Sequence, residues 1–148
     1  TYLCSKIALP HLLKADNPHI LNLSPPLNME PHWFKNHTAY SMAKYGMSMC
    51  VLGMAAEFEG RVGVNALWPR TAIATAAVRN LLGGEAMVNA SRKPEIIADA
   101  AWYVLTKPQA ECNGNFFVDD DVLAAAGITD LDPYAVKPGT PLAPDFFV

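Results

Sequence analysis

The sequence predicts an α/β fold in which helices cover both faces of a parallel β-sheet. Three short apolar runs are typical of buried strands: 19–24, 62–68 and 115–118. Stretches with helical spacing of apolar residues alternate with them: 2–14, 38–58 and 94–105. Strands that alternate with helices form parallel β-α units, so the working side chains are expected beyond the carboxyl ends of the strands.

Proline and glycine set the expected boundaries of these elements. Pro10 is expected to kink or interrupt the first helix. Pro25 and Pro26 end the first strand, because neither can donate a hydrogen bond to a neighbouring strand. Gly60 is a suitable stop for the long second helix, and Pro69 ends the strand that follows.

The later part of the chain is less regular. The segment 71–90 is expected to form mobile helical pieces around Gly83 and Gly84. Four prolines after Gly127 predict an extended tail across the surface. The main domain is therefore expected to span 1–126, with 127–148 as a proline-rich extension packed on it.

The composition excludes several classes of protein. With 148 residues, 51% hydrophobic and 17% charged, the chain fits one globular domain. A net charge of −3 offers no basic field for nucleic acid, and no apolar run reaches the roughly 20 residues of a membrane span. The histidines have no metal-like spacing, and Asp119-Asp120-Asp121 is expected to be a solvated strand end. Cys4, Cys50 and Cys112 are expected to be small buried hydrophobic residues in a reducing compartment.

Tyr40 and Lys44 form the pair most suited to chemistry. Four residues apart, they share one face of the helix over 38–58. A phenol titrates near pH 10, and bringing that value to about 7 requires roughly 4 kcal/mol in favour of the phenolate. One cation about 4 Å away at an effective dielectric of about 20 supplies most of this. The pair is therefore suited to acid/base interconversion of an alcohol and a ketone.

The same spacing occurs a second time, at Tyr2 and Lys6, and both pairs cannot be the active site. A Tyr-x-x-x-Lys pattern by itself usually indicates only an amphipathic helix whose tyrosine hydroxyl and lysine ammonium are exposed to solvent. Context favours Tyr40, since it follows a buried strand and a roomy loop, whereas no strand precedes Tyr2.

Four motifs stand in the order and spacing of one enzyme family: Asn22-Leu23-Ser24, Tyr40-Ser41-Met42-Ala43-Lys44, Val64-Asn65-Ala66-Leu67-Trp68-Pro69 and Gly114-Asn115-Phe116-Phe117-Val118-Asp119. Over nearly its whole length the sequence resembles the short-chain dehydrogenase/reductases. Longer motifs narrow the resemblance to one branch of that family: 22–26, 43–49, 137–139 and 144–147. The resemblance implies the C-terminal half of a Rossmann-type domain that transfers hydride between NADP or NAD and a carbonyl or alcohol.

The resemblance also implies roles for single residues. Tyr40 would donate or accept the proton, and Lys44 would lower its pKa and hydrogen-bond the nicotinamide ribose. Pro69, Ile73 and Thr75 would approach the nicotinamide carboxamide. The helix of Tyr40 commonly packs against its counterpart in this family, so a homo-oligomer is plausible.

Three departures from the family pattern qualify these roles. The family's serine after the first strand aligns with Pro25, so Ser24, one place early, either holds the substrate oxygen or simply caps the strand. Pro69 is followed by Arg70 instead of glycine, with one extra residue before Ile73. The glycine-rich turn and the asparagine of the proton relay do not occur, and both would lie upstream of this chain.

These departures leave two interpretations open. Because the cofactor pyrophosphate binds at such a glycine turn, the chain alone is expected neither to bind NADP tightly nor to turn over substrate. The pairs Trp33-Phe34 and Leu81-Leu82 favour an apolar or lipid-like substrate covered by 71–90, and the resemblance suggests a peroxisome or mitochondrion. The alternative, supported by Pro25, is a catalytically silent Rossmann-like module for binding or assembly.

Overall fold

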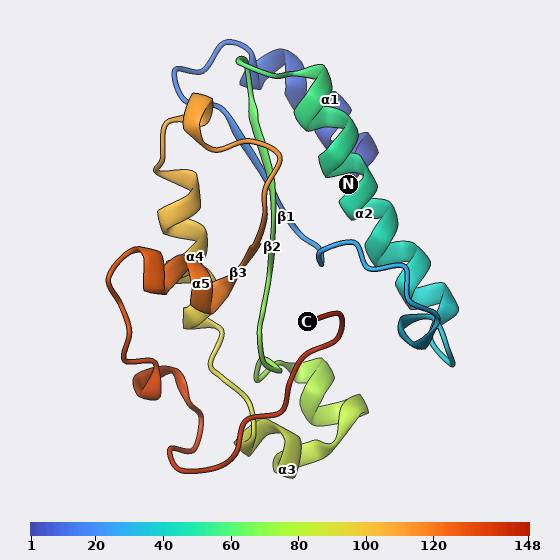
Figure 1. Cartoon of the computed structure of the whole chain (residues 1–148), viewed down its shortest axis with the longest axis vertical. Helices are drawn as coiled ribbons and strands as arrows, with labels where there is room; N and C mark the ends of the chain where they lie inside the picture. The colour runs from blue at the N-terminus through green and yellow to red at the C-terminus, as the bar shows by residue number, and fades with distance from the viewer. The chain divides into compact units, whose positions relative to one another are not determined.

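The structure, a computed structural model, describes all residues from 1 to 148. Strands β1 (His19–Leu23), β2 (Gly63–Trp68) and β3 (Phe116–Val118) form one parallel sheet in the order β1-β2-β3 (Figure 1). β1 pairs with β2 from His19 opposite Gly63 onward. The predicted α/β class with a Rossmann-like parallel sheet is confirmed.

The helices alternate with these strands along the chain. They are α1 (Tyr2–Leu12), α2 (Thr38–Glu57), α3 (Gly84–Asn89), α4 (Glu95–Leu105) and α5 (Asp119–Ala125). Shorter turns of 3-10 or π geometry are η1 (Pro31–Trp33), η2 (Val78–Leu82), η3 (Gln109–Glu111) and η4 (Asp132–Tyr134). None of the helices is both long and apolar enough to cross a membrane.

The chain divides into two compact units, each described by itself. Unit 1 consists of 1–68, 104–117 and Phe147. Unit 2 consists of 69–103, 118–146 and Val148. The sequence-based division into 1–126 and 127–148 follows a different criterion and stays a prediction.

The core of unit 1 lies between the sheet and the helices α1 and α2, which run alongside each other in Figure 1. Its fully enclosed members come from α2, β2 and the residue before β2: Val51, Met54, Ala55, Val62, Val64 and Ala66. Leu9 and Leu12 of α1 pack against them. The buried positions of α2 recur every three or four residues, which is the stripe of an amphipathic helix: Ser41, Tyr45, Ser48, Val51, Met54 and Ala55.

β2 is the central strand, and all six of its residues are buried. A strand that pairs on both edges and is covered on both faces needs a largely apolar run, and Asn65 is the one polar residue in β2. Gly63 begins it because a Cβ there would lie 2.7 Å from the carbonyl oxygen of Cys112 and 2.8 Å from Nδ1 of His19. Any larger residue would push β1 or the 112–115 loop away.

Two asparagine side chains join β2 to the loop before β3. Buried Asn65 donates from Nδ2 to the Cys112 carbonyl at 2.8 Å, and its Oδ1 accepts from the Asn115 amide at 3.0 Å. Asn113 accepts from the Val64 amide at 3.0 Å and donates from Nδ2 to the Ala55 carbonyl at 3.0 Å. These bonds satisfy backbone groups that would otherwise be buried unpaired.

Several sequence-based expectations were wrong. Pro10 does not interrupt α1, which continues through it to Leu12, although the missing N–H leaves the Lys6 carbonyl without its intrahelical bond. Cys4 is exposed, although Cys112 is buried as expected. The tail does not lie wholly on the surface, since Ala135 and Phe147 are buried.

Candidate active site

Tyr40 and Lys44 lie near the start of α2. Because they are four residues apart, they share one face of the helix. Tyr40 is 46% exposed, so its side chain is accessible from solvent. The helix therefore presents an accessible phenol with an ammonium one turn further on.

The ammonium of Lys44 is positioned at the carboxyl ends of two strands. Its Nζ donates a hydrogen bond at 3.3 Å to the carbonyl of Leu23, the last residue of β1. The same Nζ lies 5.1 Å from the ring centroid of Trp68, the last residue of β2, which is a cation–π distance. Lys44 thus points to the edge of the sheet at which α/β folds bind their ligands.

Tyr40 belongs to a group of side chains that we call the aromatic cluster: Trp33, Tyr40, Tyr45, Trp68 and Phe147. The ring of Phe147 is 6.2 Å from that of Tyr40, centroid to centroid, with the two planes 9° apart. It is 4.9 Å from Tyr45, 5.6 Å from Trp33 and 6.1 Å from Trp68. Sequence reasoning missed Phe147, because no periodicity distinguishes one buried aromatic residue in an irregular proline-rich tail.

The second tyrosine of the cluster has a different environment. Tyr45 is 2% exposed, and its hydroxyl donates to the Asn28 carbonyl at 2.6 Å. Burial raises the pKa of the Tyr45 phenol. A phenol bonded to a backbone carbonyl and shielded from water is poorly suited to proton exchange. Of these two neighbouring tyrosines, Tyr40 is the one that a ligand can reach.

Ser24, the candidate for holding a substrate oxygen, is fully buried, and its Oγ makes no hydrogen bond. The loop after β1 is instead tied to α2 through the Pro25 carbonyl, which accepts a bond from Ser48 Oγ at 2.6 Å. The backbone N–H of Ser24 donates to the Asn22 carbonyl at 3.0 Å. The Ser24 hydroxyl therefore neither caps the strand nor faces solvent.

The second tyrosine–lysine pair lies elsewhere in unit 1. Tyr2 and Lys6 of α1 line a shallow depression together with Leu9, Met54 and Phe58. Tyr2 is 64% exposed. Neither side chain is bonded to the carboxyl end of a strand, in contrast to Lys44.

The predicted cofactor residues Pro69, Ile73 and Thr75 lie in one loop of unit 2. Ile73 forms a bridge with Arg92, and the Thr75 Oγ1 accepts from the Val78 amide at 3.3 Å at the start of η2. Thr75 is exposed. The structure thus groups these three residues with one another, and separately groups Tyr40, Lys44 and Ser24 in unit 1.

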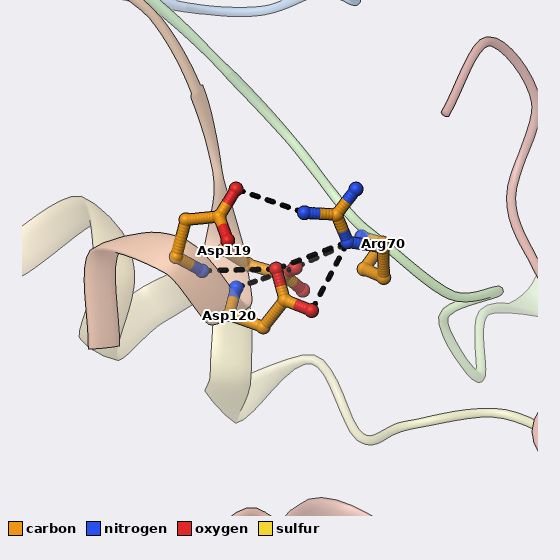
Figure 2. Close-up of polar contacts among 4 residues, drawn as sticks. Arg70, Asp119 and Asp120 are labelled. Atoms are coloured by element: carbon orange, nitrogen blue, oxygen red, sulfur yellow. Dashed lines mark hydrogen bonds and ion pairs between the residues drawn. The ribbon is translucent and has the colours of Figure 1, made fainter. Parts of the chain in front are cut away.

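Arg70, the residue that replaces the family's glycine, holds this loop to the start of α5 (Figure 2). Its backbone N–H donates to Asp119 Oδ1 at 2.8 Å. Its guanidinium bonds Asp120 at 3.1 Å and Asp121 at 2.8 Å. The bond to Asp120 raises the pKa of the guanidinium. The arginine that departs from the family pattern therefore has structural partners of its own.

The expectation of a solvated strand end at 119–121 was wrong. Asp119, Asp120 and Asp121 form the first turn of α5, where acidic side chains are favoured by the helix dipole. Asp119 is fully buried, and burial raises its pKa, while bonds from the amides of Arg70 and Asp120 lower it in part. Acidic residues immediately before an apolar run are a helix-start signal that would have revealed α5.

Unit 2 also contains an apolar pocket of about 280 Å³. It is lined by parts of the 71–90 segment and of the tail: Ala72, Val78, Leu82, Met87, Pro144, Asp145 and Phe146. Leu82 is one of the residues from which the sequence predicts an apolar substrate. No group of three or more His, Cys, Asp or Glu side chains is arranged to hold a metal ion.

Comparison with known sequences shows what this chain is similar to. No family model matches the chain. Two proteins called hydroxysteroid dehydrogenase-like protein 2 are similar over all 148 residues: 62% identical for that of Danio rerio and 56% for that of Homo sapiens. The match covers 100% of this chain and 35% of each relative, so the chain spans about a third of the length of the curated relatives.

Solved structures share the fold. A protein of Xanthomonas campestris assigned as a dehydrogenase superposes with a TM-score of 0.94 at 53% identity, over 99% of this chain and 54% of that one. A short chain dehydrogenase of Mycobacterium thermoresistibile gives 0.89 at 50% identity, over 99% and 52%. Aldohexose dehydrogenase of Thermoplasma acidophilum gives 0.63 at 22% identity, which shows the fold alone.

The fold and the edge of the sheet described above define a class: the chain has the architecture of part of a short-chain dehydrogenase. Within that class its sequence relatives are the proteins called hydroxysteroid dehydrogenase-like protein 2. The longer motifs at 22–26, 43–49, 137–139 and 144–147 had predicted this branch.

Proposed function

We propose that the chain is the C-terminal half of an NAD(P)-dependent oxidoreductase that interconverts an alcohol and a carbonyl, with Tyr40 and Lys44 as its acid/base centre. The observation that carries the proposal is the position of Lys44. Its ammonium bonds Leu23 and lies over Trp68 at the carboxyl ends of β1 and β2, one helical turn from the exposed Tyr40. The similarity to dehydrogenases along the whole chain supports it.

In this mechanism Tyr40 exchanges one proton with the substrate oxygen. In the direction of alcohol oxidation, the Tyr40 oxygen accepts the hydroxyl proton as the C–O bond becomes a carbonyl. In the reverse direction it returns that proton. The nearby Lys44 ammonium favours the charged phenolate by Coulomb attraction, which makes either step accessible near neutral pH. The bond to Leu23 holds the ammonium in place and limits the reorganisation that each step requires.

The residues present fit the nicotinamide end of NADP or NAD. The ammonium of Lys44 and the phenol of Tyr40 can both hydrogen-bond ribose hydroxyls, and the two side chains share one face of α2. In unit 2 the loop with Pro69, Ile73 and Thr75 would approach the carboxamide. The bound cofactor supplies or takes up the hydride.

No glycine-rich turn between a strand and a helix occurs in this chain, and such a turn is where a cofactor pyrophosphate binds. We therefore propose that these 148 residues alone neither bind NADP tightly nor turn over substrate. Isothermal titration of the isolated chain with NADP should give no saturable heat, and micromolar affinity would contradict this part of the proposal.

An apolar or lipid-like substrate is supported by the pocket in unit 2. Its lining is dominated by hydrophobic side chains, among them Val78, Leu82 and Met87. A second support is the aromatic cluster around Tyr40 in unit 1. Burial of apolar groups against such surfaces is the main source of affinity for ligands with few polar atoms.

Ser24 enters the proposal as the candidate that holds the substrate oxygen. Its buried hydroxyl has no partner, so replacement by Ala removes no existing side-chain bond. A Ser24→Ala variant with lower kcat and unchanged stability would support the role. Unchanged kcat would remove Ser24 from the mechanism.

Tyr40→Phe in the full-length polypeptide tests the central claim. We expect kcat to fall roughly 10²-fold or more, because the group that exchanges the proton is gone. The chain offers a matched control in Tyr2→Phe, which changes the other tyrosine four residues before a lysine and should leave kcat unchanged. Equal activity of Tyr40→Phe and the wild type would refute the proposed centre.

A catalytically silent binding or assembly module is the second candidate. It is favoured by Pro25 at the position of the family's serine and by the burial of the Ser24 hydroxyl. Such a module would show no turnover for Tyr40→Phe to abolish, so the same experiment separates the two.

Two further features of the protein are part of the proposal. Met42, Met49 and Leu52 of α2 are between 47% and 66% exposed, and we propose that this helix face contacts a second copy of the chain. The peroxisome or mitochondrion is proposed from the resemblance alone.

A further inference from the structure

Phe147 is buried although it lies in an irregular segment outside any helix or strand. Its side chain belongs to unit 1, and the residue is only 4% exposed. Irregular segments usually run over the protein surface unless specific contacts hold them. The contacts of Phe147 are therefore the feature to explain.

The backbone of Phe147 adopts φ 74°, in the left-handed region that bulky residues rarely occupy. Such a conformation persists only where the surroundings fix it, and it is concentrated at functional sites. Here the surroundings are the four other rings of the aromatic cluster, which come from α2, from η1 and from the end of β2.

Polar bonds hold the wall behind Phe147 in place. The Tyr45 hydroxyl donates to the Asn28 carbonyl at 2.6 Å. Ser41 Oγ donates to the Trp33 carbonyl at 2.5 Å. Because these bonds fix the neighbouring rings, Phe147 is held in one position against Tyr45 and Trp33.

The ring of Phe147 also packs beside Tyr40, the exposed member of the cluster. The two rings are nearly parallel, at 9°, with centroids 6.2 Å apart. The Phe147 ring also lies 6.1 Å from Trp68, whose own ring is contacted by Lys44. One apolar side chain of the proline-rich tail therefore packs beside Tyr40 and is connected to Lys44 through the ring of Trp68.

We infer that Phe147 is a specificity-determining residue: its ring is the apolar wall beside the Tyr40 phenol and limits the bulk of the group attached to the reacting carbon. The inference rests on the proposed function of Tyr40 and goes beyond it, because it assigns a role in substrate choice to the C-terminal tail. The ligand class is a ketone or secondary alcohol with an apolar substituent.

Two ketones that differ only in chain length test the inference in the full-length polypeptide: 2-butanone and 2-decanone. Phe147→Ala should raise the ratio of kcat/KM for 2-decanone over 2-butanone by about tenfold, since one or two methylene groups alter discrimination by that much. Phe147→Leu keeps an apolar anchor and should give a smaller rise. It remains informative if the alanine variant does not fold.

Phe116→Leu is the matched control, because Phe116 packs against the core of unit 1 away from the aromatic cluster. Its ratio should equal that of the wild type. Equal ratios in wild type, Phe147→Leu and Phe147→Ala would overturn the inference, as would an equal change in the Phe116 control.

A binding measurement does not depend on turnover. The dissociation constants of 2-butanol and 2-decanol with the cofactor-loaded protein should change by the same ratio in Phe147→Ala, and the absence of any change would overturn the inference. Tyr40→Phe separates the two claims. If that variant keeps full activity, the proposed function fails; if it loses activity while the Phe147 ratios stay constant, only the inference about Phe147 fails.

Discussion

Lys44 donates a hydrogen bond at 3.3 Å to the carbonyl of Leu23, across the junction between α2 and the last residue of β1. This bond fixes an ammonium at the sheet edge before any ligand is present. A positioned charge costs little reorganisation when a neighbouring group ionises. The relationship therefore links the fold of unit 1 to the chemistry proposed for Tyr40.

Lys44→Met should lower kcat/KM at neutral pH by roughly 10²-fold, because the phenolate loses its nearest cation. The rising limb of the pH–rate profile should move to higher pH. Lys44→Arg keeps the charge and should retain part of the activity and the position of the limb. A Lys44→Met enzyme with an unchanged pH–rate profile would show that the ammonium has no part in proton exchange.

Asn65→Leu should destabilise the protein by about 3 kcal/mol, since it leaves the Cys112 carbonyl and the Asn115 amide buried without partners, at roughly 1–3 kcal/mol for each. Urea denaturation measures the loss. Asn80→Leu, at an exposed position, should change stability by no more than about 0.5 kcal/mol. Similar midpoints for the two variants would contradict the assigned role of Asn65.

The positions that sequence reasoning predicted well share a local cause. Pro25 and Pro69 end strands by their own geometry, and the apolar run of 62–68 is long enough to identify a central strand. The shared helix face of Tyr40 and Lys44 was predictable, because residues four positions apart on a helix lie on the same face. Each of these inferences needs only neighbours in the sequence.

The features that were missed depend on contacts between distant segments. No neighbouring residue in the sequence predicts the burial of Phe147. The rings that enclose it come from distant parts of the sequence, the first of them at Trp33. Asn65 reads as one polar residue within a strand, and its partners lie at 112–115. Such roles follow from tertiary structure and not from local pattern.

Asp119 provides a test through pH. Because folding raises the pKa of this carboxyl above 3.8, the native state keeps a proton that the unfolded chain releases. Its contribution to the free energy of unfolding is fully present below the unfolded pKa and is lost as pH rises through the folded pKa. Asp119→Asn should therefore gain stability relative to the wild type as pH rises through that window.

The stability difference between Asp119→Asn and the wild type is measured by urea denaturation at a series of pH values. Asn keeps an oxygen that can accept the amides of Arg70 and Asp120. The exposed Asp16→Asn is the control and should show no such trend. A flat difference for Asp119→Asn would mean that its carboxyl is ionised alike in both states.

Tyr134 should ionise at higher pH than an ordinary tyrosine. Its hydroxyl donates to Asp99 Oδ2 at 2.6 Å, and this bond raises the pKa of Tyr134 to about 12. The stabilisation is complete below the unfolded value of 10.0 and is lost as pH rises through about 12. Tyrosinate absorbance should therefore include one late step.

Asp99→Asn should move that late step toward pH 10, because the negative partner is gone. Tyr134→Phe should remove the step and leave the rest of the titration as it was. If the late step survives in Tyr134→Phe, another tyrosine carries it and the assignment to Tyr134 is wrong.

The burial of Phe147 matters for anyone who trims or tags this part of the protein. Cutting the chain after Phe146 would remove a side chain that is 4% exposed and would leave a hole among four aromatic rings. A protein shortened in that way would report on damage to its interior, so a truncation in this segment should retain Phe147.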